Sequence, residues 1–93
     1  MKRILKDYNY HLRMERAMSQ NTVASYCSDV EQFVAFYGGR AEDVRTEDVE
    51  GFLQSRPFLS KRTLARTLSS LRSFCSWLVL EGLLKDNPCA PPP

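Results

Sequence analysis

The 93-residue sequence has little of what membrane spans, exported leaders and metal sites require. No apolar run approaches the roughly 18–20 residues that cross a bilayer, and the opening MKRILKDYNYHLRMER is too polar for a signal peptide. The single histidine, His11, has no recognisable partner for catalysis. We therefore expect a cytoplasmic protein with no membrane partner.

Cysteines are also too few, and too irregularly spaced, for a metal site. The three cysteines lie 48 and 14 residues apart and match no zinc or redox signature. Cys27 and Cys75 fall among apolar helical positions, which predicts buried, inert thiols. Cys89 lies in the tail and has no predicted role. We expect neither a metal nor another cofactor.

No stretch alternates between apolar and polar residues with period two, so we expect no sheet. The intervals between the few glycines and prolines carry helical periods instead. They predict an all-α protein with helices near residues 2–16, 19–37, 46–55 and 60–82. Predicted caps support these limits, namely Ser19, Gly38, Thr46, Ser60 and Gly82.

Proline is concentrated in the tail DNPCAPPP, at residues 86–93. We expect this tail to be the start of a linker and not a packed element. The predicted domain therefore covers residues 1–85.

Acidic residues are absent from residues 51–80, which carry five cations. Residues 19–50 carry seven acids and two cations. A basic segment attracts acidic partners, of which nucleic acid is the commonest. The alternative is that the basic and acidic segments neutralise each other within the fold.

The last predicted helix has two opposite faces. Its apolar stripe predicts the core: Leu64, Leu68, Leu71, Cys75, Leu78 and Gly82. The opposite face carries cations and short hydroxyl side chains: Arg62, Arg66, Ser69 and Ser73, with Ser70 beside them. Short side chains allow close approach, and arginine and serine donate to phosphate oxygens or base edges, so this face suits DNA. The alternative is a solvated face.

Trp77 and Leu80 also fall on the outer side of this helix. Either a neighbouring helix covers them, or they are open to another domain or subunit.

Three blocks in this order resemble the N-terminal core-binding domain of tyrosine recombinases, a family that includes the Xer proteins and phage-type integrases. The first is a serine–threonine–tyrosine pattern at Ser19, Thr22 and Tyr26, and the second is a short helix after Thr46. The third matches at Arg66, Leu68, Ser69, Leu71, Arg72, Phe74, Gly82, Asn87 and Pro88. The resemblance covers about residue 5 to Pro88.

The resemblance implies a four-helix, SAM-like orthogonal bundle that clamps one side of double-stranded DNA for recombination or integration. It implies contacts from the second and fourth helices, at Thr22, Tyr26, Lys61, Arg62, Thr63, Arg66, Ser69, Ser70 and Arg72. Its other implied partners are the protein's own C-terminal catalytic domain and further recombinase protomers, with no small-molecule substrate.

The same resemblance assigns all catalytic residues to that other domain, so we expect no activity from this chain. A nucleophilic tyrosine needs an activating group beside it, and we promote none of Tyr8, Tyr10, Tyr26 and Tyr37. One competing interpretation is a helical protein-interaction module that docks through Trp77, Leu80 and the acidic middle segment. A helix-turn-helix repressor is a weaker alternative, because no tight turn joins two short helices before a recognition helix.

Overall fold

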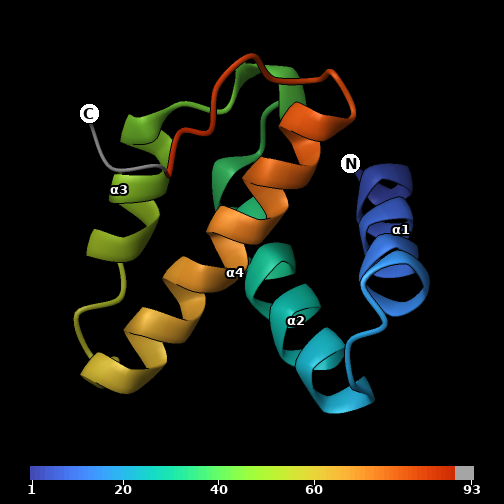
Figure 1. The fold of residues 1–93 in the computed structure, drawn as a ribbon. Helices are drawn as coiled ribbons and strands as arrows, with labels where there is room; N and C mark the ends of the chain where they lie inside the picture. The colour runs from blue at the N-terminus through green and yellow to red at the C-terminus, as the bar shows by residue number, and fades with distance from the viewer. Residues whose placement is uncertain (90–93) are drawn as a thin grey trace.

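A computed structural model describes residues 1–89 and confirms the all-α prediction, with no strand in that range. Four α-helices and two short helical turns follow one another: α1 (Lys2–Tyr10), a π-helical turn (His11–Glu15), α2 (Gln20–Tyr37), a 3-10 turn (Ala41–Asp43), α3 (Thr46–Gln54) and α4 (Lys61–Leu80). In Figure 1, α1 and α3 lie on opposite sides of the pair formed by α2 and α4. None of the described helices is long and apolar enough to cross a bilayer.

Capping chemistry accounts for the ends of the two long helices. Ser19 and Ser60 each accept a hydrogen bond from the backbone N–H three residues later, at 3.3 and 3.2 Å. Gly38 ends α2 with a φ of 70°, a conformation that glycine adopts without a steric penalty. These three predicted ends are confirmed.

The start of α3 differs from the prediction. Thr46 is the first residue of the helix, and Arg45 occupies the cap position. The backbone N–H of Arg45 donates to Asp48 Oδ2 at 2.8 Å, so an acid inside the first turn closes this end. The Thr46 hydroxyl is used elsewhere and donates to the backbone oxygen of Pro88 at 3.0 Å.

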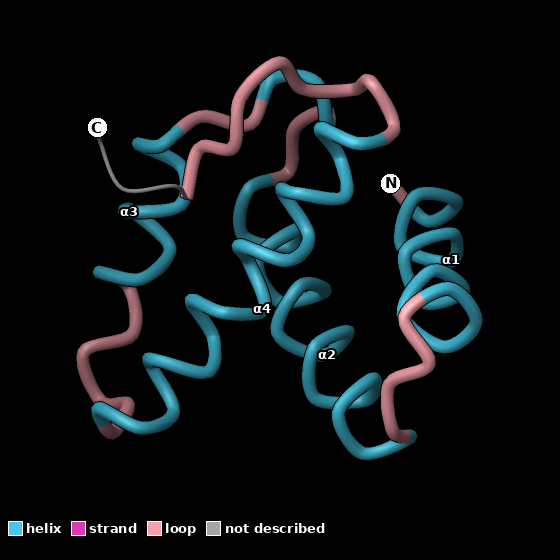
Figure 2. The backbone as a smooth tube through the Cα atoms, viewed as in Figure 1, coloured by secondary structure: helices cyan, strands magenta, loops and turns pink. Residues whose placement is uncertain are grey.

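Both halves of the core are built on α2 and α4, as the smooth trace in Figure 2 helps to follow. On one side, α1 and its π-helical turn add Tyr8 and Leu12. On the other side, α3 adds Val49 and Phe52. Aromatic rings meet edge to face in each half, with centroids 5.2 Å apart for Tyr8 and Phe74 and 5.5 Å apart for Phe33 and Phe52.

The predicted core face of α4 is only partly right. Leu71, Cys75 and Leu78 are buried, but Leu64 and Leu68 are only half-buried. The buried surface extends to four residues outside the predicted stripe: Thr67, Ser70, Phe74 and Trp77. Because α4 has neighbours on two sides, it is buried over a wider arc than one stripe.

A neighbouring helix covers Trp77. The residue is 5% exposed, and its ring centroid lies 5.5 Å from that of Tyr8 and 6.1 Å from that of His11. The sequence left open whether Trp77 packs under a neighbouring helix or is open to another domain or subunit. The structure shows that it packs under a neighbouring helix. Leu80, by contrast, is 73% exposed. The interaction-module interpretation thus loses its aromatic anchor.

The segment after α4 packs against the helix, contrary to the expectation of an unpacked tail from residue 86. Asn87 Nδ2 donates to the backbone oxygen of Arg72 and to Ser76 Oγ, at 3.2 and 2.8 Å. Cys89 is buried. The tail is polar and proline-rich, but its amide and carbonyl groups find partners on α4 and α3. Residues 90–93 of the expected linker lie outside the described part of the chain.

Candidate nucleic-acid interface

The helices α2 and α4 begin with the same serine–x–x–threonine cap, and both begin at the lower end of the molecule in Figure 1. The hydroxyls of Ser19 and Ser60 also donate to the hydroxyls of Thr22 and Thr63, at 2.8 and 3.1 Å. Each threonine hydroxyl therefore accepts from its cap and keeps its own proton. Because helix N-termini carry partial positive charge, these two ends are suited to an anion.

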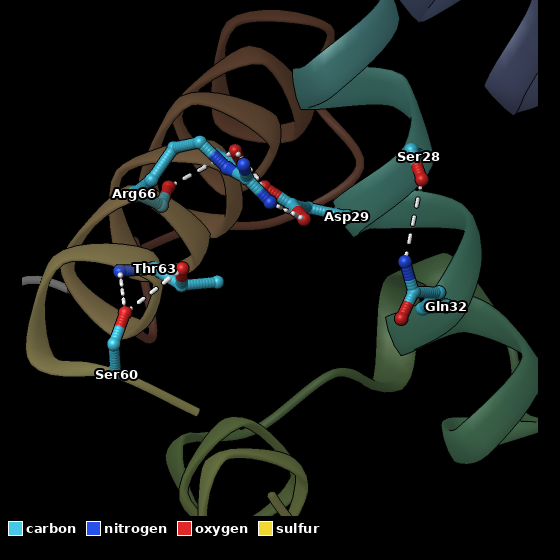
Figure 3. Close-up of polar contacts among 7 residues, drawn as sticks. Ser28, Asp29, Gln32, Ser60, Thr63 and Arg66 are labelled. Atoms are coloured by element: carbon cyan, nitrogen blue, oxygen red, sulfur yellow. Dashed lines mark hydrogen bonds and ion pairs between the residues drawn. The ribbon is translucent and has the colours of Figure 1, made fainter. Parts of the chain in front are cut away.

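A polar network joins α2 to α4 at Arg66, six residues after the second cap (Figure 3). Arg66 donates from Nε to Asp29 Oδ2 at 3.2 Å and from Nη2 to Asp29 Oδ1 at 3.0 Å. Ser70 Oγ lies 2.8 Å from Asp29 Oδ2 and 3.1 Å from the backbone oxygen of Arg66. Its single proton goes to the nearer carboxylate, so Asp29 accepts from both α4 side chains.

Burial explains why this carboxylate needs so many donors. The side chain of Asp29 is 4% exposed, whereas that of Arg66 is 49% exposed. A buried carboxylate is costly unless it is paired and hydrogen-bonded. The hydrogen bond to Asp29 raises the pKa of Arg66, so the guanidinium stays charged.

The bonds to Asp29 use one edge of the Arg66 guanidinium. An arginine has five N–H donors, and two are directed at the carboxylate. The other three form no hydrogen bond within residues 1–89, and the side chain as a whole is half-exposed. The guanidinium is therefore held in one orientation while it can still bind a second acceptor.

The cations at the start of α4 stand open. Lys61 and Arg62 are exposed, and within residues 1–89 neither forms an ion pair. Ser69 is exposed as well. Their positive charge is not offset by contacts in the described chain, which leaves it free to attract a polyanion. We call Lys61, Arg62, Thr63 and Arg66 the α4-start patch.

Tyr26 and Arg72 lie apart from that patch but close to each other. Both line a groove of about 510 Å³ that runs between the start of α2, the π-helical turn and the second half of α4. Arg16 lines the same groove, which adds a second guanidinium. Nε of Arg72 donates to the backbone oxygen of Cys89 at 3.3 Å, which orients the side chain. We call this the Arg72 groove.

The structure places four of the nine predicted residues in the α4-start patch and two in the Arg72 groove, and it removes one from the surface. Thr22 and Ser69 belong to neither group. The wheel placed Ser70 beside the outer face, and this placement is wrong because Ser70 is fully buried. Its hydroxyl serves Asp29 instead. Burial of Thr67 on the same side of the helix explains the error, because α2 packs against this part of α4.

Sequence reasoning missed Asp29 and Arg56. Asp29 directly precedes the buried Val30 on α2. An acid beside the apolar face of a helix indicates a cation from another segment, because a buried carboxylate needs a partner of opposite charge. Arg56 and Arg66 line one recess of about 130 Å³ with Gln32. The guanidinium of Arg56 lies 4.7 Å above the ring of Phe52, a contact for which the sequence gives no local signal.

The tyrosines have ordinary structural contacts. Burial raises the pKa of Tyr8, whose hydroxyl donates to Ser73 Oγ at 2.8 Å. The hydroxyl of Tyr37 donates to the backbone oxygen of Arg40 at 2.9 Å. His11 pairs with Glu15 at 2.6 Å. Within residues 1–89, no group of three histidine, cysteine or acidic side chains is arranged to hold a metal ion.

Comparison with known proteins gives one family. The phage integrase, N-terminal SAM-like domain matches residues 5–82. The tyrosine recombinase XerC of Thermodesulfovibrio yellowstonii is 38% identical over 80 residues, which is 84% of this chain and 27% of that protein. A tyrosine recombinase of Thermosipho africanus is 32% identical, over 95% of this chain and 34% of that protein.

A third relative, the tyrosine recombinase XerC of Neisseria meningitidis, is 40% identical over 77% of this chain and 27% of that protein. The chain therefore spans about a quarter to a third of the length of these relatives. No solved structure matches it.

Proposed function

Since this chain belongs to the family of phage integrase N-terminal SAM-like domains, we propose that it is the core-binding domain of a site-specific tyrosine recombinase. In this role it clamps double-stranded DNA for strand exchange or integration. The chemistry belongs to a C-terminal catalytic domain, and further protomers of the recombinase assemble on the same DNA. The protein works in the cytoplasm. Residues 1–85 form the domain, and residues 86–93 begin the linker, whose first part packs back on α4 through Asn87 and Cys89.

One observation carries the proposal. The α4-start patch exposes Lys61 and Arg62 at the first turn of a capped helix, and neither forms an ion pair within residues 1–89. Asp29, which contacts this part of α4, is buried and already bound by Arg66. A phosphate approaching this end therefore meets Lys61 and Arg62 with no exposed carboxylate from α4 itself. Phosphate contacts of this kind supply most of the affinity of non-specific DNA binding.

Arg66 and Lys61 have different proposed roles. The Asp29 contact fixes one edge of the Arg66 guanidinium, which lowers the entropy lost when the other edge binds. A fixed, forked donor suits a base edge, where geometry decides specificity. Lys61 is a flexible point charge in the first turn, which suits the backbone.

The Arg72 groove provides a second contact zone. Arg16 and Arg72 bring two cations to the side of the molecule that holds the start of α2. Thr22 lies at that start with a free hydroxyl proton. We propose that this zone binds phosphates flanking the segment that α4 reads, with Tyr26 as a hydrogen-bonding neighbour.

A salt titration of duplex binding tests the proposal. With about four phosphate contacts, log K against log salt should fall with a slope near −3 to −4, and non-specific Kd should lie near 10⁻⁴ to 10⁻⁶ M. The double substitution Lys61→Ala with Arg62→Ala should reduce the slope by about two. Lys85→Ala removes one charge five residues after the C-terminal end of α4 and should leave the slope unchanged.

A flat salt response of the folded wild-type chain rejects DNA binding. If Lys85→Ala and Lys61→Ala reduce the slope equally, the phosphate contacts are not concentrated at the α4-start patch. The two proposed roles separate in a binding assay on matched and mismatched DNA sites. Arg66→Ala should cost about 1–3 kcal/mol on the matched site and reduce discrimination. Lys61→Ala should weaken both sites equally.

A further inference from the structure

Two of the three cysteines meet in the fold. Cys75 lies in α4 and Cys89 lies in the segment that follows, with their Sγ atoms 3.7 Å apart. Both are free thiols and both are buried, at 0% and 9% exposure. Cys27 lies elsewhere, and its Sγ accepts from Asn9 Nδ2 at 3.4 Å. The sequence predicted a buried, inert thiol at Cys75 because that residue falls among apolar helical positions, and it gave Cys89 no role.

The segment after α4 holds Cys89 in place through its backbone. The backbone N–H of Cys89 donates to Asn87 Oδ1 at 2.8 Å, and its carbonyl oxygen accepts from Arg72 Nε at 3.3 Å. Asn87 is in turn anchored on the backbone oxygen of Arg72 and on Ser76. These hydrogen bonds to α4 position Cys89, and they therefore explain why its sulfur lies next to that of Cys75.

The two thiols differ in acidity. The hydrogen bond with Cys75 and the nearby Arg72 cation lower the pKa of Cys89. The same hydrogen bond, together with burial, raises the pKa of Cys75. The thiolate is the reactive form of cysteine. Cys89 is also the less buried of the pair, so it is the thiol that meets an oxidant first.

We propose that Cys75 and Cys89 form an oxidisable dithiol whose disulfide staples the segment after α4 onto that helix. A disulfide has an S–S length of about 2.05 Å, so the sulfurs must approach by about 1.7 Å. The staple would also fix the carbonyl group that orients Arg72. This inference does not depend on DNA binding.

A small-molecule disulfide such as oxidised glutathione supplies the oxidising equivalents. The Cys89 thiolate attacks one sulfur, forms a mixed disulfide and expels one glutathione thiolate. Cys75 then loses its proton, attacks the Cys89 sulfur and expels the second glutathione thiolate. The two protein thiols are oxidised, and the small disulfide is reduced to two thiols that take up the released protons.

The experiment uses the 93-residue chain with Cys27→Ser, which leaves only the pair. After incubation of the folded protein with oxidised glutathione, we expect a monomer that has lost two hydrogens by mass and has no free thiol in an alkylation assay. Closing this loop should raise Tm by roughly 10–20 °C, and dithiothreitol should reverse the shift.

The matched control is Cys89→Ala in the same background, which keeps Cys75 but should show neither the mass loss nor the Tm shift. Its circular dichroism reports whether it is folded. Cys75→Ser provides a second variant, which should stop at a glutathione adduct on Cys89. The proposal is overturned if the pair remains reduced, if the product stops at the glutathione adduct with both cysteines present, or if the disulfide forms between two chains.

Discussion

The two halves of α4 differ both in sequence and in surroundings. In residues 61–70, α2 approaches from one side and Asp29 binds Arg66, while Lys61, Arg62 and Ser69 remain exposed. In residues 71–80, α1 also packs on the helix, and Phe74, Trp77 and Leu78 are buried. One helix thus presents a charged end and an embedded end, because its first half carries Lys61, Arg62 and Arg66 and α1 packs on its second half.

The comparison shows how one helix can combine stability with binding. The embedded half anchors α4 through apolar burial, which contributes most of the stability of a small domain. The open half places its cations on a fixed support, and one buried ion pair limits the movement of Arg66. Substitutions in each half of α4 can test this division.

Trp77→Ala should lower the free energy of unfolding by about 3–5 kcal/mol, because it leaves a cavity between α1 and α4. Leu80→Ala, three residues later on the exposed side, should change it by less than about 0.5 kcal/mol. Urea denaturation measures both. If the two variants lowered the free energy of unfolding equally, the packing of α1 on Trp77 would add no more stability than the exposed Leu80 does.

Arg66→Ala should lower the free energy of unfolding by about 1–3 kcal/mol, because the buried Asp29 carboxylate loses its cation. Solvent at the half-exposed guanidinium keeps this below the cost of breaking a fully buried pair. In the background Asp29→Asn, the same substitution should cost less, since no charge is left unpaired. Equal costs in the two backgrounds, measured by urea denaturation, would argue that the ion pair contributes no coupling.

Ser60→Ala should cost about 1 kcal/mol, because the amide of Thr63 loses its cap acceptor. Ser69→Ala is the matched control, since Ser69 is exposed within the same helix, and it should cost less than about 0.5 kcal/mol. Thermal unfolding compares the two. A Ser69 variant that is as destabilised as the Ser60 variant would show that the hydroxyls of the open half are structural.

Lys61→Ala should have the smallest effect on the fold, below about 0.5 kcal/mol, because Lys61 is exposed and has no ion-pair partner in residues 1–89. Its effect should appear instead in the salt dependence of duplex binding, where the slope should fall by about one. A marked loss of stability with an unchanged slope would contradict the assignment of the open half to binding.

Local chemistry was sufficient for the helices themselves. The serine caps and Gly38 set the limits of α2 and the start of α4 within the described chain, as predicted. These features depend only on neighbouring residues, whose hydrogen bonds form wherever the helix forms. The Arg45–Asp48 contact at α3 was also local, but arginine is not a common cap and so gave no signal.

The contacts between helices could not be read in the same way. Ser70 and Arg66 of α4 both bind Asp29 of α2. Cys75 of α4 contacts Cys89 in the segment that follows the helix. Each of these contacts joins residues from different segments of the chain. A helical wheel sorts residues by their own polarity and assumes that the polar side of the helix is exposed to solvent. It contains no information on where α1, α2 or the tail will lie.

An all-helical domain with two capped long helices and an acid-free basic segment follows from the amino-acid sequence, because helical periodicity, capping and charge are properties of residues close together in the chain. Which of those charges remain exposed depends on how the helices pack. Packing of α1 buried Trp77, packing of α2 bound Arg66 to Asp29, and folding back of the tail placed Cys89 against Cys75. Burial depends on the neighbour that covers a side chain, and that neighbour comes from a distant part of the chain.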